Sequence, residues 1–182
     1  MDTSYKGPIR LVLFDVDGVL TDGSLHLSGN GEAIKTFNAR DGLAIGLLHA
    51  HGILSGVLSG KASAPLDYRI KQLKFDVSET GRLDKRDAYE IIKGKCGLSD
   101  DQIAFIGDDV VDLPLIGVVR TFYAPSDAHE LIRLRADYVL KTEGGKGVAR
   151  ELAEHLLQAN GLDLEQIYRP LMNQWGCHHA VQ

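Results

Sequence analysis

The sequence predicts an α/β fold, a doubly wound, mostly parallel sheet of the Rossmann-like kind with helices on both faces. Short apolar runs alternate with longer amphipathic stretches, which is the pattern of repeated strand–helix units. Polar residues rich in aspartate follow several of the apolar runs, as expected where strands end at a binding edge. The 182 residues suffice for one full core and are few for two, so we expect a single domain over residues 1–182.

The elements follow one another in order from the N-terminus. The run IRLVLF at residues 9–14 predicts a buried strand. Residues 24–38 hold two short segments around the turn-rich SGNG, which predicts a small β-hairpin insertion. The next stretch has helical spacing and ends at Gly52, a residue suited to a helix C-cap. Further strands are expected at 53–59, 103–107, 118–124 and 137–140, and further helices at 64–74, 84–95, just after Asp112, at 127–135 and at 147–160.

Composition narrows the classes of function. The net charge of −5 disfavours a nucleic-acid partner, which requires a basic face. No apolar run approaches the ~20 residues of a membrane helix, and the N-terminus lacks the apolar core of a signal peptide. Cys96 and Cys177 lie far apart without metal-type spacing, as expected of reduced thiols in a cytoplasmic protein. The tail at 162–182 has weak signals, so we expect an arm outside the core.

Three predicted strand ends carry chemically useful groups. Asp15 and Asp17 follow the first strand, Ser59 and Gly60 the second, and Asp108 a third. Two carboxylates placed two residues apart require a cation or a bound proton, and hard oxygen ligands of this kind suit Mg²⁺. A calcium loop of the EF-hand type is excluded for residues 15–26, because its sixth position is leucine and its twelfth is histidine.

With a phosphate also bound, these residues suffice for phosphoryl transfer. Asp15 can attack phosphorus, and Asp17 can protonate the leaving oxygen and later deprotonate water. Ser59 and the backbone near Gly60 can hold the transferring oxygens, and Lys85 can neutralise charge in the transition state.

The motifs DVDGVLTDG, LSGK, LDK and GDDVVD, in this order, resemble those of the haloacid dehalogenase superfamily of phosphohydrolases. The resemblance implies that Asp15 is the nucleophile and Asp17 the acid/base, with its backbone carbonyl also facing the metal. It implies that Ser59 and Lys85 bind the phosphoryl group and that Asp108 completes the Mg²⁺ site. Asp109 and Asp112 would lie near that site.

Finer features point to one branch of this superfamily. No gap between the predicted elements is long enough for a separate cap domain. The hairpin, the segment FNARDG and the glycine-rich KTEGGKGVARE resemble the 3-deoxy-D-manno-octulosonate 8-phosphate phosphatases. That resemblance implies a cytoplasmic homotetramer in lipopolysaccharide biosynthesis, in which neighbouring subunits close each active site.

One position departs from that pattern. The octulosonate phosphatases usually have arginine where this chain has Lys61, and lysine lacks the bidentate fork that suits a carboxylate. Phosphatases for the nine-carbon acid KDN tend to have glutamate there, so we expect the eight-carbon acid and keep a nine-carbon sialic-type 9-phosphate as the alternative. Lys61 and Arg69 are the preferred candidates for the substrate carboxylate, with Arg40 and Gly60 as further substrate contacts.

Other interpretations remain open at this level. A phospho-receiver domain also uses a parallel sheet and acidic residues, but its lysine follows the later strands, whereas Lys85 precedes the third strand end. A non-catalytic oligomerisation domain is disfavoured by the intact Asp15 and Asp17. Asp22, beside Gly23, suits a turn better than catalysis. The cluster Cys177, His178 and His179 at the terminus is more typical of an incidental end than of a metal site.

Overall fold

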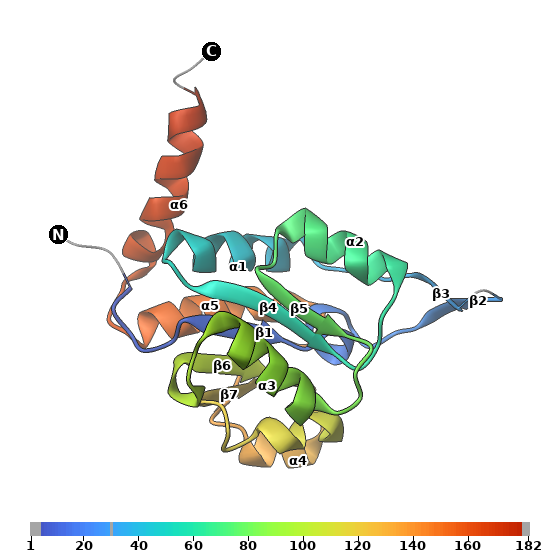
Figure 1. The fold of residues 1–182 in the computed structure, drawn as a ribbon. Coiled ribbons are helices and arrows are strands. Elements are labelled where there is room, and N and C mark those ends of the chain that lie inside the picture. The colour runs from blue at the N-terminus through green and yellow to red at the C-terminus, as the bar shows by residue number, and fades with distance from the viewer. Residues whose placement is uncertain (1–4, 30, 180–182) are drawn as a thin grey trace.

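The computed structural model describes residues 5–29 and 31–179, with side chains as far as residue 176 (Figure 1). Its centre is a six-stranded sheet in the order β5-β4-β1-β6-β7-β8. Every recorded pairing between these strands is parallel, so the predicted fold class is confirmed. The strands are β1 (Leu11–Phe14), β4 (Leu54–Ser59), β5 (Val77–Thr80), β6 (Ile103–Ile106), β7 (Thr121–Ala124) and β8 (Tyr138–Val139).

Helices cover both faces of this sheet. The helices are α1 (Ala39–Ala50), α2 (Ala64–Leu73), α3 (Lys85–Cys96), α4 (Glu130–Arg135), α5 (Val148–Gln158) and α6 (Leu164–His179). One apolar cluster joins the sheet to α1, α2, α5 and the first half of α6. A second cluster joins the opposite face to α3, α4 and the 3₁₀ turn η3 (Val110–Leu115). The core therefore consists of two apolar layers separated by the sheet.

The central strand β1 shows why this sequence forms a doubly covered sheet. All four of its residues are fully buried. Val12 and Phe14 belong to the cluster with α1 and α5, whereas Leu11 and Leu13 belong to the cluster with α3. Successive side chains of a strand point to opposite faces, so a continuous apolar run is what a strand buried on both sides requires.

The predicted hairpin insertion is present and leaves the body of the molecule. Strands β2 (His26–Ser28) and β3 (Gly31–Ile34) pair antiparallel and project beyond the rest of the chain (Figure 1). No separate cap domain covers the sheet edge in the described residues.

The structure adds two features to the sequence prediction. Strand β5 is a sheet edge that the sequence did not predict, because VSET is polar and only partly buried. The tail at 162–182 was predicted to be an arm outside the core, and this is wrong for its first half. That half of helix α6 packs into the core through Ile167 and Leu171 before the helix extends away from the body (Figure 1). The side chains of Cys177, His178 and His179 lie outside the described residues. No helix in the described part of the chain is long and apolar enough to span a bilayer.

Candidate active site

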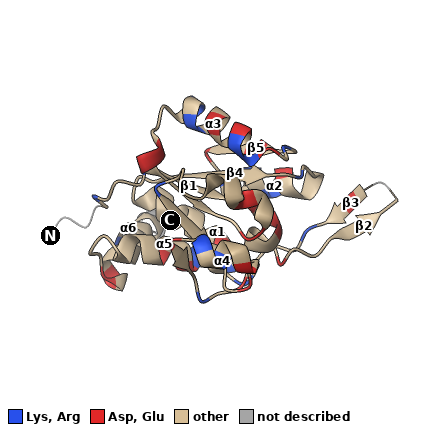
Figure 2. Cartoon of the chain, turned by 90° about the horizontal axis from the view of Figure 1, so that it is seen from below, with Lys and Arg blue, Asp and Glu red and all other residues tan. Residues whose placement is uncertain are grey.

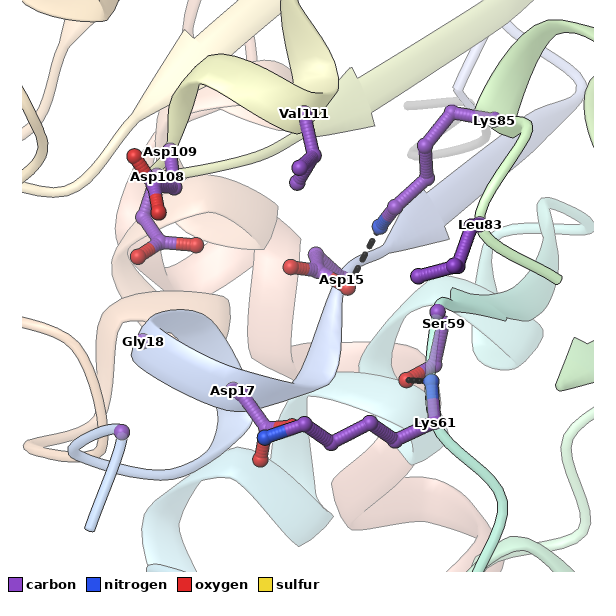
Figure 3. Close-up of a pocket in the computed structure, with 12 residues that line it drawn as sticks. Asp15, Asp17, Gly18, Ser59, Lys61, Leu83, Lys85, Asp108, Asp109 and Val111 are labelled. Atoms are coloured by element: carbon purple, nitrogen blue, oxygen red, sulfur yellow. Dashed lines mark hydrogen bonds and ion pairs between the residues drawn. The ribbon is translucent and has the colours of Figure 1, made fainter. Parts of the chain in front are cut away.

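A cavity of about 300 Å³ opens at the carboxyl ends of β1, β4 and β6 (Figure 3). This is the edge at which parallel α/β sheets bind ligands. Most of the residues predicted from the sequence line this one cavity: Asp15, Asp17, Ser59, Gly60, Lys61, Lys85 and Asp108. Leu83 and Val111 line it as well and give its mouth an apolar margin.

Asp15 lies at the end of β1, and its carboxylate pairs with Lys85. The Asp15 backbone N–H donates to the Ile106 carbonyl of β6 at 3.0 Å, which fixes the residue where two strands end. Lys85 Nζ donates to Asp15 Oδ1 at 2.6 Å and to the Leu58 carbonyl at 2.9 Å (Figure 3). Burial raises the pKa of Asp15 to about 6, although Lys85 opposes that shift.

Lys85 is the first residue of α3, and its side chain is only 1% exposed. Its ammonium also lies 3.1 Å from Asp112 Oδ1. Burial acts to lower the pKa of Lys85, but Asp15 and Asp112 outweigh it and raise the pKa above its ordinary value. Lys85 is therefore a buried, charged lysine held between two carboxylates.

Asp108 and Asp112 bring two more carboxylates to the same place. Asp112 Oδ2 accepts from the backbone N–H of Asp108 at 3.0 Å, so η3 holds the two residues together. Burial raises the pKa of Asp108 to about 8, and the charges of Asp15, Asp112 and Asp109 add to that shift. Asp108 Oδ1 is buried and has no hydrogen-bond partner among the described residues.

This acid cluster (Asp15, Asp108 and Asp112) has the ligand chemistry of a divalent cation site. One oxygen from each carboxyl group lies within 4.8 Å of the others. The Lys85 ammonium pairs with Asp15 and Asp112, which leaves Asp108 without an ion-pair partner among the described residues. Its buried oxygen Oδ1 is costly to leave unpartnered unless a cation binds it. All-oxygen ligands with room for substrate and water fit Mg²⁺.

Asp17 occupies the wall opposite the acid cluster. It lies in the turn η1 (Val16–Leu20), and its carboxylate turns toward lysines rather than toward Asp15. Lys61 Nζ is 3.8 Å from Asp17 Oδ2, and Lys35 Nζ contacts Asp17 Oδ1 directly. Lys35 is a residue of this site that the sequence analysis missed, since it follows the hairpin and no motif marks it.

Two glycines allow the backbone to pack closely around the site. Gly18 has a φ of +83°, and a Cβ there would lie 2.0 Å from Asp108 Oδ2. A Cβ on Gly144 would lie 1.9 Å from the Gly18 carbonyl oxygen. The glycine-rich segment predicted at residues 141–151 thus packs its backbone against the loop after β1.

The remaining sequence candidates take different places. Ser59 is buried at the end of β4, and its Oγ accepts from the Lys61 backbone N–H at 3.2 Å. Arg69 donates to the Asn38 carbonyl at 3.1 Å and lies over the Phe37 ring, outside the cavity. Arg40 lines a separate hollow beside Lys146 and Arg150. Asp22 Oδ1 accepts from the Ser24 N–H at 3.0 Å, in agreement with its predicted turn role.

Fold and site together define a class, that of the haloacid dehalogenase-like hydrolases. The family model of that description matches residues 69–152.

Relatives along most of the chain define the branch. The 3-deoxy-D-manno-octulosonate 8-phosphate phosphatase KdsC of Haemophilus influenzae is 45% identical over 153 residues, which cover 84% of this chain and 85% of that protein. The corresponding enzyme of Escherichia coli K12 is 36% identical over 84% of this chain and 81% of its own length. The chain belongs to the family of 3-deoxy-D-manno-octulosonate 8-phosphate phosphatases.

Solved structures agree with this assignment. The cobalt-bound phosphatase of Haemophilus influenzae superimposes with a TM-score of 0.83 at 43% identity, over 88% of this chain and 96% of that one. The phosphatase of Moraxella catarrhalis was solved with magnesium, phosphate and KDO. It superimposes with a TM-score of 0.79 at 33% identity, over 83% of this chain and 87% of that one.

Proposed function

We propose that this protein is a Mg²⁺-dependent phosphatase that hydrolyses 3-deoxy-D-manno-octulosonate 8-phosphate. The observation that carries the proposal is the cavity lined by Asp15, Lys85 and Asp108, with the buried Asp112 in the same acid cluster, in a chain 45% identical to an enzyme of that name. The Moraxella catarrhalis relative, solved with magnesium, phosphate and KDO, supports both the metal and the sugar acid.

Asp15, Asp108 and Asp112 would hold the Mg²⁺, with the backbone carbonyl of Asp17 as a further predicted ligand. When bound, the ion would supply positive charge that neutralises the phosphate. Lys85, Ser59 and the backbone at Gly60 would hold the phosphoryl oxygens. These assignments follow from the residues that line the cavity and, for Asp112, from its place in the acid cluster.

The reaction then proceeds in two displacements. An Asp15 carboxylate oxygen attacks phosphorus, the bond to the sugar oxygen breaks, and that oxygen takes a proton from Asp17. Water next attacks the phosphorus of the aspartyl phosphate and gives a proton to Asp17, which releases inorganic phosphate and regenerates Asp15. Lys85 keeps the Asp15 carboxylate in place through the 2.6 Å contact.

Lys61 is the proposed contact to the substrate carboxylate. It lines the cavity with its side chain 52% exposed, so its ammonium can turn from Asp17 toward a bound anion. Arg40 and Arg69 lie off the cavity of a single chain, and their contact to the substrate stays a prediction.

A homotetramer is the proposed assembly. The hairpin exposes Leu25 (45%), Leu27 (70%) and Ile34 (60%), and Figure 2 shows its two strands almost without charge. Apolar side chains on a projecting hairpin favour burial against neighbouring subunits, which would also cover the open cavity. Action in the cytoplasm, within lipopolysaccharide biosynthesis, completes the proposal.

Phosphate release with Mg²⁺ tests the substrate. The esters to compare are octulosonate 8-phosphate, nine-carbon acid 9-phosphates and simple sugar phosphates. We expect strong preference for the octulosonate ester, reduced in Lys61→Met through a higher KM and unchanged in Lys71→Met, which alters an exposed lysine of α2. Preference for a nine-carbon ester would move the assignment to that substrate, and turnover of no ester would refute the phosphatase.

A further inference from the structure

Lys35 is a buried lysine that the phosphatase mechanism above does not use. It directly follows β3, at the point where the hairpin returns to the body of the protein. Its neighbour Ile34 is 60% exposed, whereas the Lys35 side chain is 0% exposed. Lysine is almost never fully buried unless it is paired, because an uncompensated charge is costly to remove from water.

The partners of Lys35 are both carboxylates. Its Nζ contacts Asp17 Oδ1 and lies 2.9 Å from Glu32 Oε1. Glu32 lies on β3, three residues before Lys35, so the hairpin and its return supply both the lysine and the acid that pairs with it. Lys35 does not line the cavity, and its buried ammonium is directed to Asp17 rather than to a ligand.

Asp17 depends on these contacts for its orientation. Among the described residues, the groups that form ion pairs with its carboxyl oxygens are the ammonium groups of Lys35 and Lys61. Lys61 is 3.8 Å away and half exposed, which leaves it free to follow the substrate. Lys35 is therefore the fixed support of the acid/base carboxyl group.

We propose that Lys35 is a positioning residue that holds the Asp17 carboxyl group in the orientation from which it protonates the leaving oxygen. The inference rests on the proposed phosphatase function. The competing interpretation is that the ion pair only anchors the hairpin to the body and contributes nothing to the reaction. The two differ in their dependence on the leaving group.

The test compares two phosphate esters in wild type, Lys35→Met and the surface control Lys71→Met. Octulosonate 8-phosphate releases a poor alkoxide leaving group that needs a proton. An aryl phosphate such as p-nitrophenyl phosphate releases a stable phenolate that does not. The parameter is kcat/KM, because it covers the steps up to departure of the alcohol and excludes the later hydrolysis of the aspartyl phosphate.

We expect Lys35→Met to lower kcat/KM for the sugar ester roughly 10- to 100-fold, part of the ~10²–10⁴-fold that a positioned general acid supplies. The loss for the aryl ester should be much smaller, and Lys71→Met should alter neither. Glu32→Gln removes the charge that pairs with Lys35. It should also lower kcat/KM more for the sugar ester than for the aryl ester, by a smaller factor than Lys35→Met. Thermal unfolding and Mg²⁺ binding of each variant establish that the fold and the metal site persist.

Equal losses for the two esters, or no loss for either, would overturn the role of Lys35 and leave the phosphatase assignment intact. A wild-type protein that hydrolyses neither ester would refute the phosphatase, and the role of Lys35 would fall with it. Partial recovery of the sugar-ester activity in Lys35→Arg, which keeps the charge, would support positioning by the ion pair.

Discussion

Asp76, at the amino end of β4, has hydrogen-bond donors beside it for its carboxylate. The acid cluster, at the carboxyl ends of β1 and β6, has too few donors for its carboxylate oxygens. Asp76 Oδ2 accepts from the Ser55 N–H at 2.8 Å and lies 2.8 Å from His49 Nε2. In the acid cluster Asp15 and Asp112 share Lys85, and Asp108 Oδ1 is buried without a partner among the described residues. The difference separates a structural acid from a site that needs a ligand.

The amino-end group also shows why residue types alone do not define a catalytic site. It contains serine, histidine and aspartate, the composition of a hydrolase triad. Ser55 Oγ and Asp76 Oδ2 both approach the same ring nitrogen, His49 Nε2, at 3.1 and 2.8 Å. A relay requires one partner on each ring nitrogen, so this cluster ties α1 to the start of β4 and β5 and has no triad geometry.

The largest expected effect is loss of the nucleophile. Asp15→Asn keeps the shape of the side chain but cannot form the aspartyl phosphate, so we expect kcat to fall on the order of 10⁴-fold or more. Phosphate release under saturating substrate and Mg²⁺ measures it. His49→Asn, at the other end of the sheet, is the matched control and should retain activity. Substantial turnover by Asp15→Asn would contradict the mechanism.

Removing one carboxylate of the acid cluster should change how stability depends on pH and metal. In the metal-free protein the pKa of Asp108 is raised to about 8, chiefly by burial, against about 3.9 in an unfolded chain. A raised native pKa gives stability that is present below pH ~4 and lost as pH rises through about 8. Metal-free wild type should therefore lose stability between pH 6 and 9, and Asp108→Asn should lose less.

Urea unfolding at the two pH values, with chelator and then with Mg²⁺, measures this contrast. Mg²⁺ should stabilise wild type more than Asp108→Asn, because a ligand that binds only the native state shifts unfolding toward higher denaturant. The same pH slope and the same response to Mg²⁺ in both proteins would show that the cluster is not the metal site.

The smallest expected effect comes from substituting Asp76, at the amino end of β4. Asp76→Ala leaves the buried Ser55 N–H without its acceptor, which should cost about 1–3 kcal/mol of unfolding free energy. Because the change lies away from the cavity, kcat/KM should stay at the wild-type value. Asp67→Ala, an exposed acid of α2, should change the stability by no more than about 0.5 kcal/mol. If the Asp76→Ala protein were stable but inactive, the distinction between structural and ligand-binding acids would be wrong.

The comparison also explains what the sequence could predict. β1 was predictable because a strand buried on both faces is a continuous apolar run, and the four motifs place their polar residues directly after such runs. β5 was not, because VSET at the sheet edge is only partly buried and has no apolar run. The helix α6 was missed because only its first half contributes to the core, through residues such as Ile167 and Leu171.

Within the site, sequence analysis identified the residues next to strand ends and missed those that tertiary packing brings in. Lys35 lies 18 positions after Asp17, on the return from a hairpin, and only folding brings the two together. Arg40 and Arg69 carry the charge expected for an anionic substrate, yet neither lines the cavity of one chain. Charge is visible in a sequence, but the direction of a long side chain is not.

The central claim is that the acid cluster at the carboxyl end of the sheet is where the phosphoryl group is transferred. The most direct test mixes the protein with octulosonate 8-phosphate and Mg²⁺, quenches in acid during turnover and maps the modified peptide by mass spectrometry. The account predicts one phosphoryl group on Asp15, absent from Asp15→Asn and absent when Mg²⁺ is removed. A phosphoryl group on another residue, or turnover by Asp15→Asn at the wild-type rate, would contradict it.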